Sequence, residues 1–271
     1  MNNRPVKMSS TKIISVVNQK GGVGKTTTAV NLTTALAASG RKVLLIDLDP
    51  QGNASTGLGI EHSHRKVTSY NLIIGDVSVL EAAIPTEIPG LSIVSANIDL
   101  SGAEIELVNM VRREYRLSEA LLAEKLPYDY IVIDCPPSLG LVTLNALTAA
   151  NSVLIPLQCE FYALEGLSHL LKTIELVHTK MNPGLTIEGV VLTMYDRRNS
   201  LTTQIEEDVR DFLGAQVYKT VIPRNVRMSE APSHGKPALI YDLNCSGSQA
   251  YLKLASELLK REKTKNELTA A

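Results

Sequence analysis

The feature that most constrains this chain of 271 residues is the run KGGVGKTT at residues 20–27. A short apolar run precedes it and a stretch with helical periodicity follows it, so we predict a strand, a glycine-rich loop and a helix in succession. Glycines let the backbone N–H groups of such a loop turn inward around a phosphate chain, and the following helix adds the positive end of its dipole. The alternative, a glycine-rich turn with a solvated lysine, has no need of this combination.

Each polar residue of the loop has an expected task. Lys25 is predicted to reach the β- and γ-phosphates of a nucleoside triphosphate, and the Thr26 hydroxyl is predicted to ligate Mg²⁺. The usual pattern G-x-x-x-x-G-K-[ST] needs a glycine at position 19, where this chain has Gln19, and Lys20 opens the loop instead. The predicted phosphate-binding residues are Lys20, Gly21, Gly22, Val23, Gly24, Lys25, Thr26 and Thr27.

The apolar pattern alternates between short β-rich runs and longer helical stretches. This alternation is typical of βαβ units, so we predict one α/β domain, a P-loop NTPase fold with a mostly parallel twisted sheet covered by helices on both faces. Several runs are apolar at consecutive positions, as strands buried on both faces are. The predicted strands are 12–18, 42–47, 91–96, 130–134, 152–157, 187–193 and 217–222. The predicted helices are 26–39, 103–126, 141–150, 164–181, 201–213 and 248–262.

Composition limits the partners of this chain. With 44% apolar and 20% charged residues and a net charge of −1, the chain is typical of a globular protein that does not coat nucleic acid or anionic membranes by overall charge. Any such contact must come from a local patch. The 3 cysteines have no C-x-x-C spacing, which argues against a disulfide framework, a zinc site or an iron–sulfur cluster within one subunit. We therefore expect a cytoplasmic protein.

Acidic residues end two of the predicted strands. Asp47 and Asp49 follow one apolar run and Asp134 ends another, at the carboxyl edge where open α/β sheets bind ligands. Asp47 and Asp49 are separated by one residue, so in an extended chain they point to opposite sides and should have different tasks. Asp134 has the form of a Walker B carboxylate that holds Mg²⁺, although an acid after a strand often only begins a loop.

The loop pattern K-G-G-x-G-K-[ST], with DLDPQGN at 47–53 and DCPP at 134–137, closely resembles the deviant Walker A ATPases of the ParA/Soj chromosome-partitioning family. The resemblance covers residues 12–259. It implies an ATPase domain over residues 12–262, after a flexible lead at 1–11 and before a polar tail at 263–271. It also implies ATP and Mg²⁺ as cofactors and slow hydrolysis that a partner protein stimulates.

The resemblance implies roles for the first lysine and the acids. Lys20 would cross the interface of a nucleotide-dependent homodimer to the phosphates bound by the partner subunit. Asp49 would orient or activate the attacking water, and Asp47 would lie near the Mg²⁺ shell. A cation delivered only on dimerisation couples nucleotide state to association, whereas binding of Lys20 to its own phosphates is the alternative. The predicted catalytic residues are Lys20, Lys25 and Asp49, and the predicted metal ligands are Thr26, Asp47 and Asp134.

Two further segments bear on the nucleotide. Pro136 and Pro137 restrict the backbone and resemble a switch that senses the γ-phosphate, although a proline pair can simply end a strand. The run TMYD at 193–196 lies where related GTPases carry T-K-x-D, and Met194 in place of lysine disfavours guanine. The resemblance implies that residues 222–225 frame adenine. The predicted base-binding residues are Met194, Pro223, Arg224 and Asn225.

Basic residues gather between positions 197 and 236, although charge runs are usually solvated faces. The resemblance implies that Arg198, Arg227 and Lys236 bind DNA phosphates without sequence specificity and in a salt-sensitive way. Dimerisation would double these contacts on one surface. The expected function is an ATPase that associates with the nucleoid when ATP-bound and, with a ParB-type centromere-binding partner, drives partitioning of the chromosome origin.

Three other functions are open to a chain with this phosphate loop. A MinD-like membrane-cycling ATPase would need an amphipathic C-terminal helix, and residues 258–267 have no aromatic anchor or sustained apolar stripe, so no membrane contact is expected. A nitrogenase-reductase-like electron carrier would need cysteines at the dimer axis, an arrangement that Cys135 and Cys159 do not reproduce. A plasmid-partition ATPase is not separated from a chromosomal one by these patterns.

Overall fold

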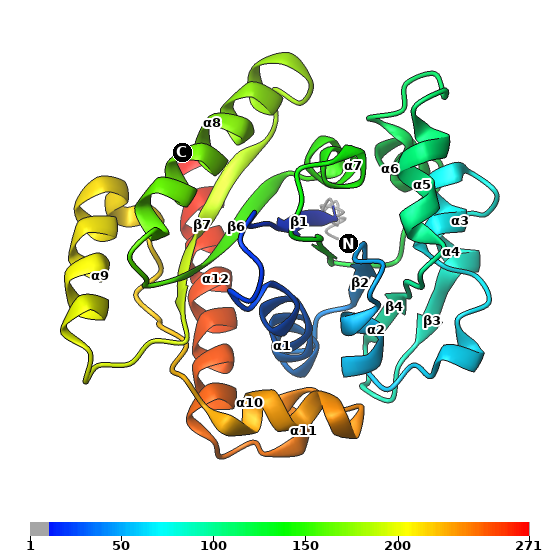
Figure 1. Ribbon diagram of the computed structural model, residues 1–271. Coiled ribbons are helices and arrows are strands. Elements are labelled where there is room, and N and C mark those ends of the chain that lie inside the picture. Colours follow the sequence, from blue (N-terminus) through cyan, green and yellow to red (C-terminus); the bar gives the residue numbers. More distant parts are fainter. Residues whose placement is uncertain (1–10, 271) are drawn as a thin grey trace, which may run out of the picture.

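The computed structural model describes residues 11–270, which form a seven-stranded sheet between two layers of helices (Figure 1). Apart from Thr11, the predicted flexible lead lies outside the described residues, as does Ala271 of the predicted tail. The strands are β1 (Lys12–Val16), β2 (Val43–Asp47), β3 (Ala83–Pro85), β4 (Leu91–Val94), β5 (Tyr130–Asp134), β6 (Ser152–Gln158) and β7 (Thr186–Thr193).

Helices connect the strands and follow the last of them. The α-helices are α1 (Lys25–Ala38), α2 (Asn53–Gly57), α3 (Ser69–Ile74), α4 (Val79–Ala82), α5 (Leu100–Leu107), α6 (Arg116–Leu122), α7 (Leu141–Ala149), α8 (Ala163–Lys180), α9 (Ser200–Leu213), α10 (Val226–Glu230), α11 (Ala238–Tyr241) and α12 (Ser246–Ala270). Short 3₁₀ turns are η1 (His62–His64), η2 (Gly214–Gln216) and η3 (Ala231–His234).

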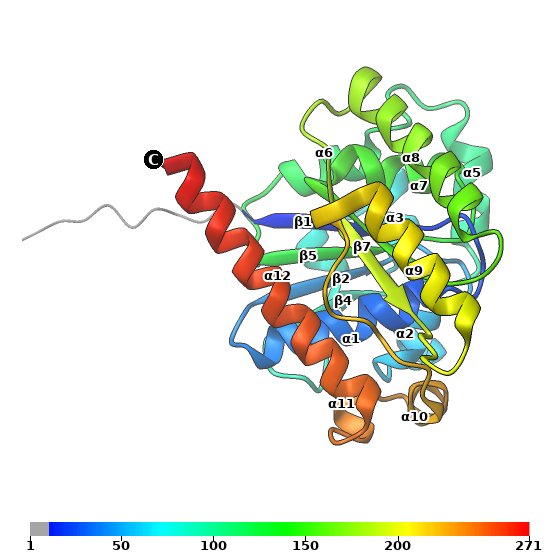
Figure 2. The ribbon, with the colours of Figure 1, turned by 90° about the vertical axis from the view of Figure 1, so that its left-hand side faces the viewer.

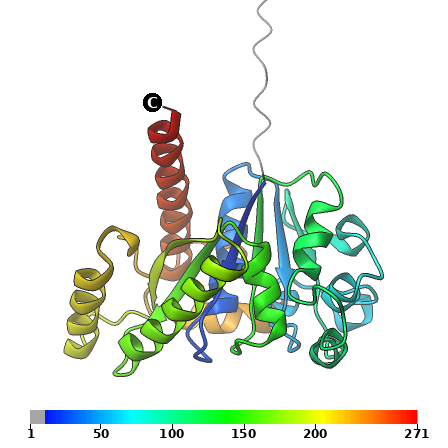
Figure 3. The ribbon, with the colours of Figure 1, turned by 90° about the horizontal axis from the view of Figure 1, so that it is seen from above.

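The strand order is β3-β4-β2-β5-β1-β6-β7. All neighbouring pairs are parallel except β3 and β4, which pair antiparallel at one edge of the sheet. Parallel neighbours need crossover connections, and the helices supply them. The carboxyl ends of the parallel strands therefore lie together at what we call the carboxyl edge, while the start of β1 and the last turns of α12 lie toward the opposite, amino edge (Figures 2 and 3).

Alternate side chains of the strands enter two separate cores. Leu44, Ile46 and Ile133 belong to the core on the face covered by α3 and α5 to α9. Leu45 and Val132 belong to the core on the other face, which is covered by α1, α2 and α10 to α12. Burial on both faces explains the consecutive apolar residues of these strands, and it confirms the predicted α/β fold with helices on both faces.

One predicted strand is wrong. Residues 217–222 run beside β7 and donate to it from the N–H of Tyr218 to the carbonyl of Val190 and from the N–H of Ile222 to that of Leu192, each at 2.8 Å, but their pairing is an isolated bridge of Val190 with Val217 and not a continuous strand. Packing adds to these bonds, because the fully buried ring of Tyr218 fills the space over Gly189 and the guanidinium of Arg261 lies 4.0 Å from that ring's centroid.

One predicted helix is divided. Residues 103–126 form two helices, α5 and α6, separated by a turn in which Arg112 has a φ of 56°. Carbonyl groups in this turn accept hydrogen bonds from α7, where the Asn145 side chain donates to the carbonyl of Arg113 at 2.8 Å and the Thr148 hydroxyl donates to that of Glu114. These side chains take the place of continued helical bonding.

The last helix is longer than predicted, because α12 continues past residue 262 to Ala270 through most of the predicted polar tail. Side chains of α1 and of the sheet hold it. Tyr251 shares a buried hydrogen bond of 3.0 Å with Thr28 of α1. Near the other end, the Lys12 ammonium bridges Glu188 at 2.7 Å and Glu262 at 2.5 Å. The helix is thus fixed both to α1 and to the start of β1.

Candidate nucleotide-binding site

The glycine-rich loop lies at the carboxyl edge between β1 and α1, as predicted. Gly22 and Gly24 have φ values of 74° and 85°, a left-handed conformation that costs glycine little and other residues more. Gly24 is the N-cap residue of α1 and gives no side-chain cap to the first turn. The N–H groups of that turn are therefore available to an anion.

Side chains and backbone groups from neighbouring strands fix this loop. The Asn18 amide donates to the carbonyl of Pro156 at 2.7 Å, and its oxygen accepts from the backbone N–H of Lys20 at 3.0 Å. The Thr193 hydroxyl at the end of β7 donates to the carbonyl of Val23 at 2.8 Å. The loop is thus held against the ends of both β6 and β7.

The two lysines of the loop have different environments. Lys25 is only 7% exposed, and its ammonium donates to the carbonyl of Lys20 at 3.0 Å. Burial lowers the pKa of Lys25, and the negative charge of Asp134 opposes that effect. The side chain of Lys20 is 46% exposed and forms an ion pair with Glu160, which follows β6. Lys25 therefore lies inside the site, whereas Lys20 lies at its surface.

Asp47 and Asp134 lie opposite each other on the paired strands β2 and β5. One oxygen of Asp47 accepts from the backbone N–H of Ser55 at 2.9 Å and from its hydroxyl at 2.7 Å, and the other accepts from the N–H of Asp49 at 3.2 Å. Complete burial raises the pKa of Asp47 to about 6 despite these bonds. Asp47 therefore holds the start of α2, and its place near a metal stays a prediction.

Asp134 has no such partners. It is fully buried, and neither carboxylate oxygen has a hydrogen-bond partner of normal geometry. Burial and then the charge of Asp47 raise the pKa of Asp134 well above its usual value, while the nearby Thr26 hydroxyl and Lys25 ammonium act in the opposite direction. Among the residues that the structure describes, Asp134 is thus the acid of this site with both oxygens unused.

These residues fit Mg²⁺. Mg²⁺ prefers oxygen ligands and is usually held by one or two carboxylates together with substrate phosphates and water. Within residues 11–270 no group of three or more His, Cys, Asp or Glu side chains could hold a metal by itself. A site that uses Asp134, the Thr26 hydroxyl and phosphate oxygens does not need such a group.

The remaining predicted catalytic and switch residues lie around the loop. Asp49 is partly buried, and one of its oxygens accepts from the backbone N–H of Gln51 at 2.9 Å. The segment that follows Asp134 ends at Gly140, where a β-carbon would lie 1.9 Å from a carboxylate oxygen of Glu104. Glu104 is exposed and this oxygen is at the end of its flexible side chain, which could turn away from a β-carbon at residue 140.

The predicted base-binding residues come from two segments that the structure joins. The N–H of Tyr195 donates to the carbonyl of Ile222 at 2.9 Å, and the N–H of Arg224 donates to the carbonyl of Tyr195 at 3.2 Å. Met194 has a φ of 48° and lies beside the phosphate loop, since a β-carbon on Gly24 would be 3.9 Å from its terminal methyl. The side-chain oxygen of Asn225 accepts from the N–H of residue 227 and so caps the start of α10.

Known proteins resemble the chain over almost its whole length. The sequence profile of a family described as an AAA domain matches residues 11–187. Chromosome partitioning protein ParA of Caulobacter vibrioides is 59% identical over 96% of this chain and 98% of its own length. Sporulation initiation inhibitor protein Soj of Bacillus subtilis is 56% identical over 91% of this chain and 98% of its own length.

The chain belongs to the ParA/Soj family of chromosome-partitioning ATPases. It is therefore an ATP hydrolase of the P-loop class, as the resemblance implied. A solved structure of cobyrinic acid a,c-diamide synthase from Mycobacterium smegmatis, with bound ADP and magnesium, has a TM-score of 0.82 and 39% identity to it. That similarity covers 94% of this chain and 97% of the other.

In this ParA/Soj chain, the predicted DNA-binding residues lie in different surroundings. The side chain of Arg198 is 89% exposed and makes two bonds to Asp196, at 2.9 and 2.8 Å. Arg227 is bonded to Glu230 at 2.8 Å. Lys236 is exposed and lines, together with Thr26, a cavity of about 290 Å³, and its contact with DNA stays a prediction.

Arg198 opens onto a groove of about 970 Å³ that is also lined by the predicted base-binding residues 223–225. Lys219 and Lys253 line the same groove, and they were not predicted. No local pattern marks them, because residue 219 lies in the irregular segment after η2 and residue 253 lies on α12. Glu160 was likewise missed, since its contact with Lys20 joins residues far apart in the chain.

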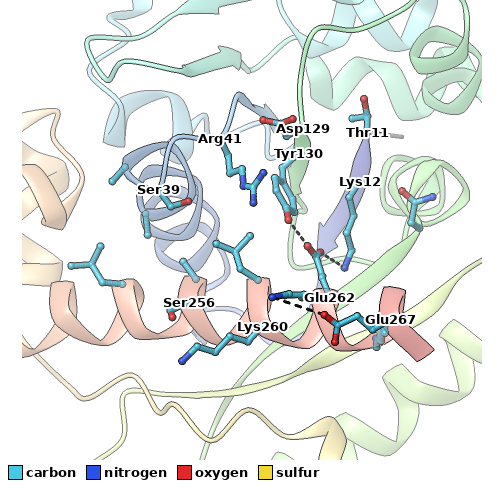
Figure 4. Close-up of a pocket in the computed structure, with 18 residues that line it drawn as sticks. Thr11, Lys12, Ser39, Arg41, Asp129, Tyr130, Ser256, Lys260, Glu262 and Glu267 are labelled. Atoms are coloured by element: carbon cyan, nitrogen blue, oxygen red, sulfur yellow. Dashed lines mark hydrogen bonds and ion pairs between the residues drawn. The ribbon is translucent and has the colours of Figure 1, made fainter. Parts of the chain in front are cut away.

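A larger cavity, of about 1100 Å³, lies away from the phosphate loop at the amino edge (Figure 4). It is lined by the starts of β1 and β5, the end of α1 and the last turns of α12, with Lys12, Tyr130 and Glu262 bonded on its wall. None of the predicted site residues lines it. Over residues 11–270, no helix has the length and apolar character needed to cross a membrane.

Proposed function

We propose that this chain is a chromosome-partitioning ATPase whose homodimer encloses ATP, binds DNA nonspecifically and releases it on hydrolysis. Membership of the ParA/Soj family supports the partitioning role. The observation that carries the proposal is the difference between the two loop lysines. Lys25 is buried at the phosphate site, whereas Lys20 is half exposed and free of that site.

ATP and Mg²⁺ are the cofactors of this site, in keeping with the nucleotide and magnesium in the related solved structure. The loop N–H groups and Lys25 bind the phosphates, and Thr26 and Asp134 hold the metal. The metal supplies positive charge that neutralises the β- and γ-phosphates. Asp49 positions the attacking water, since its second oxygen is not used by the hydrogen bond to residue 51.

Lys20 acts on the partner subunit's nucleotide. The reason is charge: two triphosphate sites that face each other repel, and a lysine from each copy neutralises the other's phosphates. Lys20→Ala should weaken ATP-dependent dimerisation while monomer nucleotide affinity changes little. Light scattering on a sizing column with a nonhydrolysable ATP and Mg²⁺ measures the first, and calorimetry measures the second. An undiminished dimer would contradict the trans role.

DNA contact is proposed at Arg198 and Arg227. Both side chains are on the surface, where Arg198 is paired with Asp196 and Arg227 with Glu230, and DNA phosphates would replace these acids. Phosphate contacts of this kind are salt-sensitive and sequence-independent. The variant Arg198→Ala with Arg227→Ala should keep ATP binding and lose ATP-dependent DNA retention. Replacing Lys172 and Lys180, exposed on α8, with alanine is the matched control. Equal DNA retention by the two double variants at moderate salt would overturn this part.

A ParB-type centromere-binding protein is the proposed activating partner. Hydrolysis of ATP by the dimer on DNA should rise when that protein is added, and the rise should be absent in Asp49→Ala. Repeated release and rebinding would then move the chromosome origin over the nucleoid. Cosedimentation with DNA and with anionic liposomes, each with and without ATP, separates this function from membrane cycling.

A further inference from the structure

Two exposed aromatic side chains follow, in the chain, the residue that pairs with the surface lysine of the loop. Phe161 and Tyr162 are 75% and 66% exposed, and they follow Glu160, the residue that holds Lys20. The chain has only 2 phenylalanines and no tryptophan, so large rings are scarce and this pair stands out on the surface. Large apolar rings in water are unfavourable, which makes an unpartnered pair informative.

The pair is held in a fixed geometry. The two rings meet edge to face, with centroids 5.0 Å apart and an interplanar angle of 86°. The backbone around them is tied by hydrogen bonds from the N–H of Ala163 to the carbonyl of Glu160 at 2.8 Å and from the N–H of Gly166 to that of Tyr162 at 3.1 Å. A rigid aromatic surface loses little conformational entropy when it is covered.

We propose that Phe161 and Tyr162 dock against a second copy of this chain and anchor the ATP-dependent dimer. This inference rests on the proposed trans role of Lys20. If Lys20 reaches the partner subunit's phosphates, the partner surface lies within the reach of one lysine side chain. Glu160 touches the Lys20 ammonium directly, so the two residues that follow Glu160 lie at that same boundary.

The position favours a second copy over an unrelated protein. In a two-fold dimer each copy presents the same residues to the other, so the interface contains two aromatic pairs, one beside each Lys20. Aromatic side chains near the centre of an interface commonly contribute most of its binding energy. Lys20 must leave Glu160 to reach the partner subunit's phosphates, and the Glu160 carboxylate, 40% exposed, then stays in contact with water at the edge of the rings.

The test is Phe161→Ala combined with Tyr162→Ala. The dimer dissociation constant is measured by analytical ultracentrifugation with nonhydrolysable ATP and Mg²⁺, and it should rise at least about tenfold. Phe212→Ala is the matched control, because Phe212 is also exposed (62%) but lies on α9. This control should dimerise like the original chain. Both proteins should keep the original melting temperature and monomer nucleotide affinity, since exposed rings contribute little to the fold.

Each other outcome has a definite meaning. If the original chain dimerises and the double variant dimerises with the same constant, the inference is wrong and the proposed function stands. If the original chain does not dimerise, the proposed action of Lys20 on the partner subunit's nucleotide is refuted, and the docking role falls with it. If the double variant dimerises normally but loses stimulation by the partner protein, the pair contacts that protein and the inference is overturned. The variant Phe161→Tyr with Tyr162→Phe keeps two rings and should dimerise with about the constant of the original chain. A weaker dimer in this variant also counts against the docking role.

Discussion

Asp134→Asn should make the ligand-free protein more stable and the nucleotide-bound protein less so. Asp134 is fully buried without hydrogen-bond partners for either oxygen, and Asp47 faces it on the neighbouring strand. An unsatisfied buried polar group costs about 1–3 kcal/mol, and more when it is charged. The amide has nearly the same shape and is still polar, so the substitution removes only the extra cost of the charge, less the favourable interaction of that charge with Lys25.

The length of the chain sets how far a change in the free energy of unfolding shifts the melting temperature. For a domain of roughly this size each kcal/mol shifts the melting temperature by about 2–4 °C, so a net gain of about 1 kcal/mol gives a rise of about 2–4 °C. The effect also depends on pH, because the folded pKa of Asp134 is raised above its unfolded value. The destabilisation is absent where the carboxyl is protonated in both states, and it grows as the pH rises through the folded pKa. The gain from asparagine should therefore be larger at about pH 8 than at about pH 5.

Thermal unfolding in EDTA and in Mg²⁺ with nonhydrolysable ATP measures both effects. The original chain should gain stability from the ligands, and the variant should gain much less because it has lost a metal ligand. Asp47→Asn is the matched control. Asp47 is an acceptor for Ser55, so its replacement should destabilise the protein with and without ligand. A variant Asp134→Asn with a lowered ligand-free melting temperature, or with the full gain from Mg²⁺ and ATP, would refute the reasoning.

Two further predictions concern contacts around the loop and α1. Glu160→Gln releases Lys20 from its ion pair, so Lys20 becomes free to reach the partner subunit's phosphates. Because the pair is exposed, the dimer dissociation constant measured by ultracentrifugation should fall by no more than about fivefold. A larger dissociation constant would show that Glu160 helps the interface instead. Tyr251→Phe removes the buried hydroxyl that bonds Thr28, and urea unfolding should show a loss of about 1 kcal/mol; an unchanged midpoint would mean that the bond adds nothing to stability.

The phosphate loop and the acidic strand ends could be predicted because each is a local pattern. Glycines, a lysine and a hydroxyl between a strand and a helix leave few alternatives, and the structure places them at the carboxyl edge. The different environments of Asp47 and Asp134 could not be predicted. Ser55, which occupies Asp47, lies 8 residues away in the chain, and no pattern tells a bonded carboxylate from a free one.

Long-range packing decided the rest. Residues 217–222 are apolar enough to read as a strand, yet they bond to β7 only at separated positions, through the N–H groups of Tyr218 and Ile222, and do not form a continuous ladder. The break between α5 and α6 depends on Asn145 and Thr148, which lie on a helix about 30 residues later in the chain. Periodicity reports the face that a segment buries, and it carries no information on such partners.

The bond between Lys12 and Glu262 brings the beginning of the first strand and the last turns of α12 together at the amino edge, away from the phosphate loop (Figures 2 and 3). A fluorescent reporter or surface tether attached beyond either end of the fold therefore extends from the side opposite the ATP site and the aromatic pair. In microscopy or surface-binding assays, such fusions should leave the ATP site and the aromatic pair accessible.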